Sequence, residues 1–442
     1  MEMINETVKN LRIKLDRREI GARELCAAYL AQIRDLNPAL QALTAVFETN
    51  ALTHAEQSQK LIDKGGANPL IGIPYAVSDN IMTAGKITTC ASKMLANFTP
   101  PYDGAVIEAL KAAHSPLIGK TALKEFSIGG TFQSGAAVSS GFIPFSIDSD
   151  TGGALRHSAA YNGMTGLRPT YGRVSRHGLA AHASSLDQIG AIAKTAEDCA
   201  IVLNTIAGKD PRDMMTFATD EDFTASIGKG IKGLTIALPK QFYGEDIDSD
   251  VKSAVRLAAE KLQAEGATLI EPETTMTDYA TAVYFILASA EASSNLSRYD
   301  GVTFGERGQG ATFFEQITDS RSKNFGDEVK RRIMFGNFVL SNLDNNYTEF
   351  YEKALALRQK IRAEYDEIFN TADLILTPTL PSIHPENFMA GFCTIPPSLA
   401  GLPSITTSCG VTPLGIPIGM LLTGKRHAEK TVIQAADFYE SL

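Results

Sequence analysis

The sequence predicts an α/β fold in which helices sandwich a mixed β-sheet. Short apolar runs typical of strands alternate with longer segments whose apolar residues recur at helical spacing. A hydrophobic content of 44% with 21% charged residues is enough for a large core. At 442 residues the chain exceeds the usual domain size, yet no repeat, low-complexity tract or clean linker divides it. We therefore expect one large domain over residues 1–442.

The expected elements follow in chain order. Residues 1–64 are predicted to form N-terminal helices, because Leu25, Tyr29 and Ile33 recur at helical spacing, and Asn37-Pro38 is expected to end that helix. Strands are predicted at 71–77, 116–119, 234–238, 268–270 and 374–379, and helices at 105–113, 196–207 and 250–265. Residues 281–358 are predicted to be mostly helical and to form a lid or side lobe.

Charge and composition argue against several function classes. The net charge of −9 gives no basic face for autonomous binding to nucleic acid. No apolar run reaches the roughly 20 residues that span a bilayer, and the N-terminus is unlike a signal peptide. The five cysteines (Cys26, Cys90, Cys199, Cys393 and Cys409) include no close pair, which argues against a zinc site or a disulfide framework. We expect a cytoplasmic protein without metal or cofactor, and without direct contact to nucleic acid or membrane.

The segment 148–156 is typical of a nucleophile loop, but it lacks a nucleophile. Gly152 and Gly153, after Thr151, allow a sharp turn whose N–H groups could approach a bound carbonyl oxygen. Asp150 and Arg156 are expected to tie this turn into the fold. A hydroxyl or thiol is expected directly after the glycines. That position holds Ala154, whose methyl group can neither attack nor ionise.

Three long motifs carry a resemblance to a known family. They are Gly-Ile-Pro-Tyr-Ala-Val-Ser-Asp-Asn at 72–80, Ser-Asp-Thr-Gly-Gly-Ala-Leu-Arg at 149–156 and Gly-Leu-Arg-Pro-Thr-Tyr-Gly-Arg-Val-Ser at 166–175. On these motifs the chain strongly resembles the amidase-signature family, and within it the A subunits of aspartyl/glutamyl-tRNA amidotransferases. Shorter matching runs at 88–95, 184–190, 297–301 and 328–334 extend the resemblance over nearly the whole chain.

The resemblance implies an amidase-signature fold and, in intact members, amide hydrolysis by a Ser–Ser–Lys set. A lysine held neutral acts as base through a bridging serine, and a second serine attacks the carbonyl carbon. In this chain the lysine position holds Ser78 and the nucleophile position holds Ala154. The loop that carries the bridging serine is deleted, with Ser134 as a candidate remnant.

The resemblance also points to substrate-binding positions. Tyr299 and the pair Arg331-Arg332 match positions at which the A subunits grip glutamine, and arginine pairs bidentately with carboxylates. Gly391 stands where glutamine-using members place an aspartate. The alternative is that both arginines only form salt bridges with Glu328 or Asp327 in a charged helical turn.

Other candidate residues are weaker. His157 follows Arg156 and could lie near the loop, where we expect a structural role. Gly119-Lys120-Thr121 lacks the first glycine of a phosphate-binding loop and is interpreted as a strand end. A thiol nucleophile at Cys393 or Cys409 is conceivable but disfavoured.

The combined losses favour a catalytically inactive protein with a scaffold, regulatory or ligand-binding role. In a serine protease, removing the nucleophile alone costs on the order of 10⁶ in turnover, and further losses add little. The alternative is a working glutamyl-tRNA(Gln)/aspartyl-tRNA(Asn) amidotransferase A subunit, or an amidase, with a non-standard nucleophile. The resemblance implies B- and C-type subunits as partners, a homo-oligomer being the other possibility, and an amino acid or amide as ligand.

Overall fold

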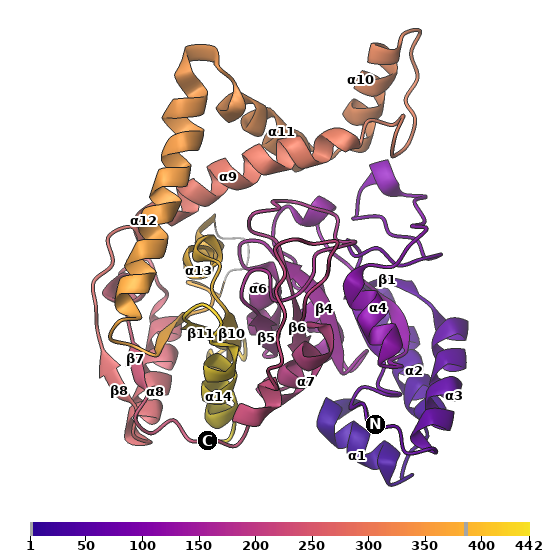
Figure 1. Cartoon of the computed structure of the whole chain (residues 1–442), viewed down its shortest axis with the longest axis vertical. Helices are drawn as coiled ribbons and strands as arrows, with labels where there is room; N and C mark the ends of the chain where they lie inside the picture. Colours follow the sequence, from indigo (N-terminus) through magenta and orange to yellow (C-terminus); the bar gives the residue numbers. More distant parts are fainter. Residues whose placement is uncertain (1–2, 384–387) are drawn as a thin grey trace.

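The computed structural model describes residues 3–383 and 388–442, and a single mixed sheet forms its centre (Figure 1). Within these residues eleven strands are ordered β1-β3-β2-β4-β6-β5-β10-β11-β9-β7-β8. The strands are β1 Leu43–Val46, β2 Tyr75–Ser78, β3 Leu117–Thr121, β4 Phe145–Asp150, β5 Thr165–Arg168, β6 Gln188–Ala193, β7 Thr235–Ala237, β8 Thr268–Ile270, β9 Leu374–Pro378, β10 Ser404–Val411 and β11 Pro417–Gly424. The predicted α/β fold is confirmed.

Parallel and antiparallel pairs form separate blocks across the sheet. Strand β2 is parallel to β3 and β4, and β7 is parallel to β8 and β9. Between these two blocks, β4, β6, β5, β10, β11 and β9 pair antiparallel. All six residues of β4 are buried, as expected for a strand covered on both faces.

Helices cover the sheet and extend beyond it. They are α1 Val8–Asp16, α2 Ala22–Leu40, α3 Glu48–Ile62, α4 Ala105–Ala112, α5 Gln133–Ser139, α6 Ala154–Tyr161, α7 Ala196–Ile206, α8 Ser249–Ala264, α9 Ala280–Asn295, α10 Phe313–Asn324, α11 Asp327–Leu340, α12 Lys353–Ile368, α13 Ile395–Ala400 and α14 Glu429–Glu440. Helices α9, α10 and α11 lie at one end of the molecule, α12 runs from that end down one side, and α9 crosses above the sheet (Figure 1). None of the described helices is both long enough and apolar enough to cross a membrane.

Strand β1, Leu43–Val46, interrupts the helices predicted over residues 1–64, and two further predicted boundaries are wrong by several residues. Helix α2 continues through Asn37-Pro38 to Leu40, because Pro38 falls in the last turn, where only one helical hydrogen bond is lost. The helix ends where Gln41 adopts the left-handed conformation and its N–H donates to the Asn37 carbonyl. The strand predicted at 71–77 begins only at Tyr75, since Gly72 has a φ of 77° and turns the chain.

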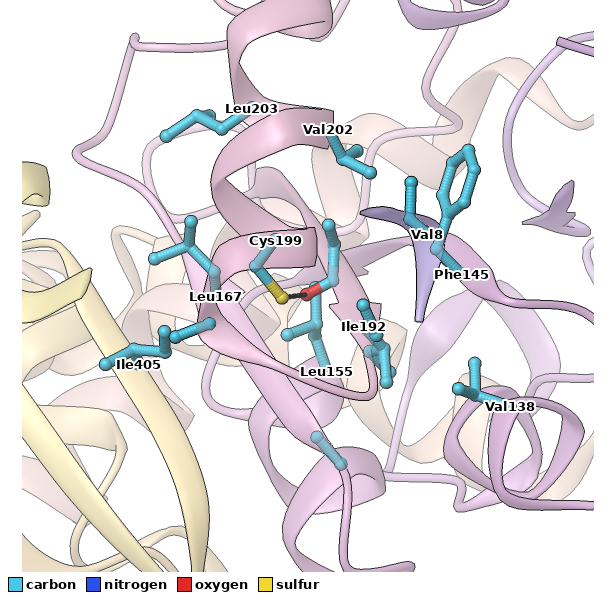
Figure 2. Packing of buried hydrophobic residues seen from close by; sticks show 14 of the residues in the cluster. Val8, Val138, Phe145, Leu155, Leu167, Ile192, Cys199, Val202, Leu203 and Ile405 are labelled. Atoms are coloured by element: carbon cyan, nitrogen blue, oxygen red, sulfur yellow. Dashed lines mark hydrogen bonds between the residues drawn. The ribbon is translucent and has the colours of Figure 1, made fainter. Parts of the chain in front are cut away.

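The core beside the site is densely packed. Figure 2 shows Cys199 of α7 packed among Leu155, Leu167, Ile192 and Ile405. Burial raises the pKa of this thiol well above its ordinary value, so Cys199 serves as a small apolar residue. Leu155 belongs to α6, and the apolar core therefore fixes the helix that begins directly after the glycine turn.

Candidate functional site

The turn between β4 and α6 requires both of its glycines. Gly153 has a φ of 135°, and a Cβ atom there would lie 2.6 Å from His157 Nε2 and still closer to Thr394 Oγ1. A Cβ atom on Gly152 would lie 2.7 Å from the Tyr284 ring. Any side chain at either position would therefore collide with the surrounding wall.

A buried ion-pair cluster fixes the base of this turn. Arg156 donates two hydrogen bonds to Asp150, at 2.9 and 2.8 Å, and Arg168 lies 3.3 Å from the same carboxylate. All three side chains are fully buried. Burial acts to raise the pKa of Asp150, but the two guanidinium groups hold it below its ordinary value. The expectation that Asp150 and Arg156 anchor the turn is confirmed.

A cavity of about 340 Å³ lies against the turn. Its lining contains six of the predicted site residues: Thr151, Gly152, Gly153, Ala154, Arg332 and Gly391. Lys124, Ser127, Gly130, His157, Tyr284 and Phe285 also line it. Four predicted residues do not line it: Ser78, Ser134, Tyr299 and Arg331. The loop therefore forms part of a ligand-sized space, but the two candidate serines lie outside it.

The two serines are buried in the sheet region. Ser78 ends β2, and its hydroxyl acts, like that of Ser134, to lower the pKa of the neighbouring Asp148. Ser134 Oγ lies 2.9 Å from Thr121 Oγ1. Asp148 of β4 lies in the strand beside Ser78, and burial raises its pKa to about 6. A buried carboxyl group therefore adjoins the position where the resemblance implies a lysine.

The two neighbouring arginines have different surroundings. Arg331 is exposed and pairs with Glu328 at 2.6 Å, as the salt-bridge alternative predicts. Arg332 also pairs with Glu328, at 2.8 Å, but its buried guanidinium lies 3.9 Å from the centre of the Phe285 ring and lines the cavity. Nε donates to Glu328 and Nη1 to Ser289, whereas no described residue hydrogen bonds with Nη2. Arg332 can therefore offer Nη2 to a ligand.

Tyr299 belongs to a separate apolar cluster. Its ring lies 4.9 Å from that of Phe126, and the residue is 7% exposed. Tyr299 therefore supports the wall behind the site and is not placed to contact a ligand in the cavity. Gly391 does line the cavity, and residue 391 itself offers no carboxylate to an ammonium group.

Sequence reasoning missed several cavity residues as site residues, among them His157, Lys124 and Ser127. His157 lies three residues after Ala154 on α6, a spacing that places both on one face of the helix. Lys124 and Ser127 flank a short 3₁₀ turn, and both line the cavity. Ser127 Oγ accepts a hydrogen bond of 2.7 Å from Asn80 Nδ2, and no hydrogen bond joins it to Lys124. A lysine and a serine thus share the cavity without forming a pair.

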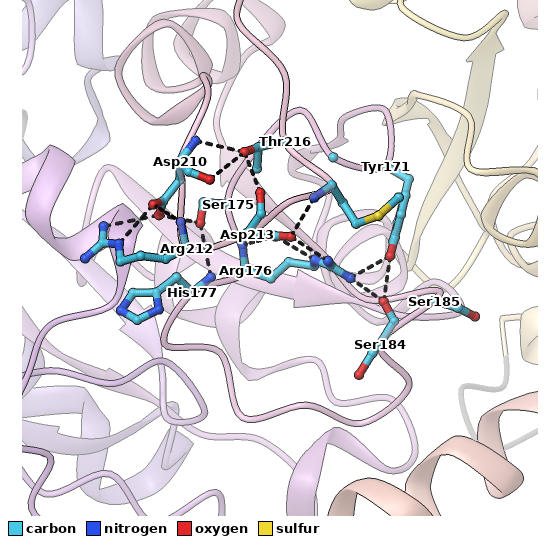
Figure 3. A network of polar contacts seen from close by, with 12 residues as sticks. Tyr171, Ser175, Arg176, His177, Ser184, Ser185, Asp210, Arg212, Asp213 and Thr216 are labelled. Atoms are coloured by element: carbon cyan, nitrogen blue, oxygen red, sulfur yellow. Dashed lines mark hydrogen bonds and ion pairs between the residues drawn. The ribbon is translucent and has the colours of Figure 1, made fainter.

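A polar network lies on the other side of Thr151. Thr151 Oγ1 donates to Asp187 at 2.6 Å, and burial raises the pKa of Asp187 to about 6. Asp187 also lines a smaller cavity of about 210 Å³. Figure 3 shows the neighbouring network, in which Arg176 donates to Asp213 at 2.7 Å and Arg212 to Asp210 at 2.9 Å. This network holds the loop at 210–216 against the site region.

Among the described residues, no cluster of histidine, cysteine and carboxylate side chains is arranged to hold a metal ion. The cavity lining offers backbone donors, the imidazole of His157, the side-chain cations of Lys124 and Arg332, and the hydroxyl groups of Ser127, Thr151, Thr281 and Tyr284.

Comparison with known proteins gives consistent results. The family model for Amidase matches residues 24–134 and 133–433. The chain is 40% identical to the A subunit of glutamyl-tRNA(Gln) amidotransferase from Ruminiclostridium cellulolyticum, covering 100% of this chain and 98% of the relative. The crystal structure of the A subunit of glutamyl-tRNA(Gln) amidotransferase from Thermotoga maritima is 32% identical, with a TM-score of 0.77 over 99% of this chain and 95% of that one. Peptide amidase from Stenotrophomonas maltophilia is 25% identical, with a TM-score of 0.82 over 98% and 96%.

Proposed function

Because this chain belongs to the amidase family, we propose that it is a catalytically inactive relative of the amidotransferase A subunits that retains a ligand-binding cavity. One observation carries the proposal: the side chain that faces the cavity directly after the two glycines is the methyl group of Ala154. No hydroxyl can attack from that position. The backbone donors of the turn remain, and such donors alone give a residual acceleration of about 10³–10⁴ over water.

The positions of the other two family residues support the same conclusion. Ser78 replaces the lysine base, and its buried hydroxyl lies outside the cavity lining. Ser134 is engaged with Thr121 within the protein. A base and a proton relay are therefore missing along with the nucleophile, so restoring one group would not restore the reaction.

Ligand binding is supported by the groups that remain in the cavity. Arg332 Nη2 and the Lys124 amine supply positive charge, and Tyr284 and Phe285 supply aromatic surface. A free carboxylate is the natural partner of such a guanidinium. We propose an amino acid or an amide as the ligand.

We propose B- and C-type amidotransferase subunits as partners in the cytoplasm, because the relatives at 40% identity are A subunits of glutamyl-tRNA(Gln) amidotransferase. With a net charge of −9 this chain would leave contact with tRNA to another subunit. Self-association is the competing arrangement, and sedimentation of the purified chain alone distinguishes the two.

A glutaminase assay tests the proposed inactivity. Ammonia release from glutamine is measured with the purified chain alone and with B- and C-type subunits, and an intact A subunit serves as the positive control. We expect release at the background rate in both samples. Turnover above background would refute the proposal.

A second candidate function rests on Lys124 and Ser127. Both residues line the cavity, so hydrolysis with Ser127 as nucleophile and Lys124 as base is the best-supported active alternative. Against it, Ser127 Oγ is held by Asn80 and is not hydrogen bonded to Lys124. If the chain does hydrolyse amides, the variant Ser127→Ala should abolish turnover, whereas Ser134→Ala should not.

A further inference from the structure

We propose that a separate cavity, between α3 and α4, binds the phosphate group of a small phosphate ester. This cavity has a volume of about 540 Å³ and shares no lining residue with the cavity beside the glycine turn. Helices α3 and α4 lie on the N-terminal side of the sheet, away from α9 and α12 (Figure 1). Ligand binding between α3 and α4 is therefore independent of the proposed function.

Basic side chains gather in this cavity. Its lining contains two lysines and two histidines: Lys86, Lys111, His54 and His114. No aspartate or glutamate occurs among its described lining residues, although the whole chain carries a net charge of −9. A recess lined by one sign of charge concentrates ions of the opposite sign, so this cavity favours an anion.

Helix α3 directs its carboxylates away from the cavity. Glu48 pairs with Arg34 at 3.2 Å. Glu56 pairs with Arg23 at 2.6 Å, and both arginines belong to α2. His54 of the same helix lines the cavity instead. The acidic residues of α3 are thus paired with α2 and not with the lysines of the cavity.

Lys86 has no carboxylate partner among the described residues. Its Nζ atom donates to Asn50 Oδ1 at 2.5 Å and lies 4.8 Å from the centre of the Phe47 ring. An ammonium group has three N–H donors, so donors remain for an anion. Because the oxygen of Asn50 accepts from Lys86, the NH₂ group of the same side chain is a further donor at the cavity.

The two histidines lie beside Lys111. The ring centres of His54 and His114 are 6.4 Å apart, and the ring nitrogens hydrogen bond with no residue in the described part of the chain. Burial, together with His114 and Lys111, holds the pKa of His54 below its ordinary value, as expected where basic groups are crowded. Lys111 donates to Asp103 at 2.5 Å, and Asp103 also accepts from the Ala84 N–H. This carboxylate offsets part of the charge of Lys111 but does not line the cavity.

The first turn of α3 adds backbone donors to the basic side chains. Phe47 precedes the helix, and no side chain caps it there. The first N–H groups of a helix have no partner within the helix, and the helix dipole favours an anion beside them. Thr49 and Asn50 belong to this turn and line the cavity.

The remaining lining suits an organic group attached to the phosphate. Phe47, Ala84 and Leu117 give the cavity an apolar side. Small-molecule sites have volumes of roughly 300–1,000 Å³, and this cavity falls within that range. We therefore expect an ester to bind more tightly than inorganic phosphate.

Calorimetric titration with matched probes tests the assignment. The purified chain is titrated with adenosine monophosphate and adenosine, with glycerol phosphate and glycerol, and with inorganic phosphate, all at constant ionic strength. We expect at least one ester to bind about tenfold or more tightly than both its phosphate-free counterpart and inorganic phosphate. A smaller preference for both esters, or no binding of any probe, would overturn the proposal.

Charge variants locate the bound phosphate. Lys86→Gln and Lys111→Gln each remove one cation from the lining and should weaken binding of the tighter ester by about tenfold. Lys60→Gln is the matched control, since Lys60 is an exposed lysine of α3 outside this lining, and it should change the affinity by less than about twofold. Arg332→Ala should likewise leave ester binding unchanged, because Arg332 lines the other cavity. Unchanged affinity in both cavity variants, or an equal loss in a control, would overturn the proposal.

Sulfate tests the contribution of the histidines, because it remains a dianion throughout the pH range in which imidazoles titrate. Protonated imidazoles attract an anion, so sulfate should bind about threefold or more tightly at pH 6 than at pH 8, and His54→Gln should reduce this difference. Proton NMR of the His54 ring gives the reciprocal measurement: saturating sulfate should raise the pKa of His54. A pKa that stays unchanged or falls in saturating sulfate would contradict the proposal.

Discussion

The variant Asp148→Asn should stabilise the folded protein at alkaline pH. Asp148 is buried in β4, beside the position that holds Ser78, and no described lysine or arginine forms an ion pair with it. Burial raises its pKa from 3.8 to about 6, although the Ser134 hydroxyl and the Ser149 amide act to lower it. Asparagine has nearly the same shape and carries no charge, so it removes the cost of burying an ionised group.

The magnitude follows from the difference between folded and unfolded pKa values. A difference of about two corresponds to about 3 kcal/mol once both states are fully ionised. Because the folded-state pKa is the higher one, the folded state binds more protons between pH 4 and 6. The contribution of Asp148 to the wild-type free energy of unfolding is therefore greatest below pH 4 and falls as the pH rises through 6. The gain from Asp148→Asn should be about 3 kcal/mol at pH 8 and about 0.5 kcal/mol at pH 4.

Urea unfolding of both proteins at pH 4, 6 and 8 measures this difference. Asp150→Asn is the matched control on the same strand, because Asp150 pairs with Arg156 and Arg168. That variant should lose about 3–5 kcal/mol at neutral pH, since it leaves buried cations unpaired. An Asp148→Asn protein that is less stable than wild type at pH 8, or whose gain does not vary with pH, would refute the reasoning.

Four further variants test the site. Ala154→Ser should not raise glutaminase activity above the wild-type background, because Ser78 occupies the position of the lysine base. Activity well above that background would show that another residue acts as the base. Arg332→Ala should weaken amino-acid binding by about tenfold or more, whereas Arg331→Ala should change it by less than about twofold, as measured by calorimetry. Gly153→Ala should lower the free energy of unfolding by more than about 2 kcal/mol, because φ is 135° and the new methyl group would overlap its neighbours. A Gly153→Ala protein as stable as wild type would contradict that geometry.

Local patterns in the sequence predicted most of the fold. The helix predicted at 196–207 is observed at Ala196–Ile206, and the strand at 268–270 is observed with the same bounds. Apolar spacing determines such elements because each buries one face or both. The end of α2 was misplaced because the cost of a proline depends on its position in the helix, and the last turn tolerates Pro38.

The site was predicted only in part, because its walls come from distant segments. The glycine turn was found because two adjacent glycines at a strand end are a local signal. Arg331 and Arg332 could not be separated in the sequence, since consecutive residues on a helix point about 100° apart and only the tertiary packing decides which one faces the cavity. No sequence pattern around Lys124 and Ser127 marks them as site residues. The three-residue spacing from Ala154 to His157, in contrast, could have suggested that both lie on the same face of one helix.

The presence of the glycine turn is not by itself evidence that the cavity still binds a ligand. The turn is tied to the core through Asp150 and Arg156, so it would persist in a protein that binds nothing, because its loss would leave buried charges unpaired. The free groups in the cavity contribute no comparable stability: Arg332 Nη2 and His157 Nδ1 have no hydrogen-bond partner among the described residues. Both residues line the cavity, and neither atom is among the described buried atoms that lack a partner, so a ligand in the cavity can reach both of them. These two atoms, and not the glycine motif, are therefore the observations that favour a retained ligand.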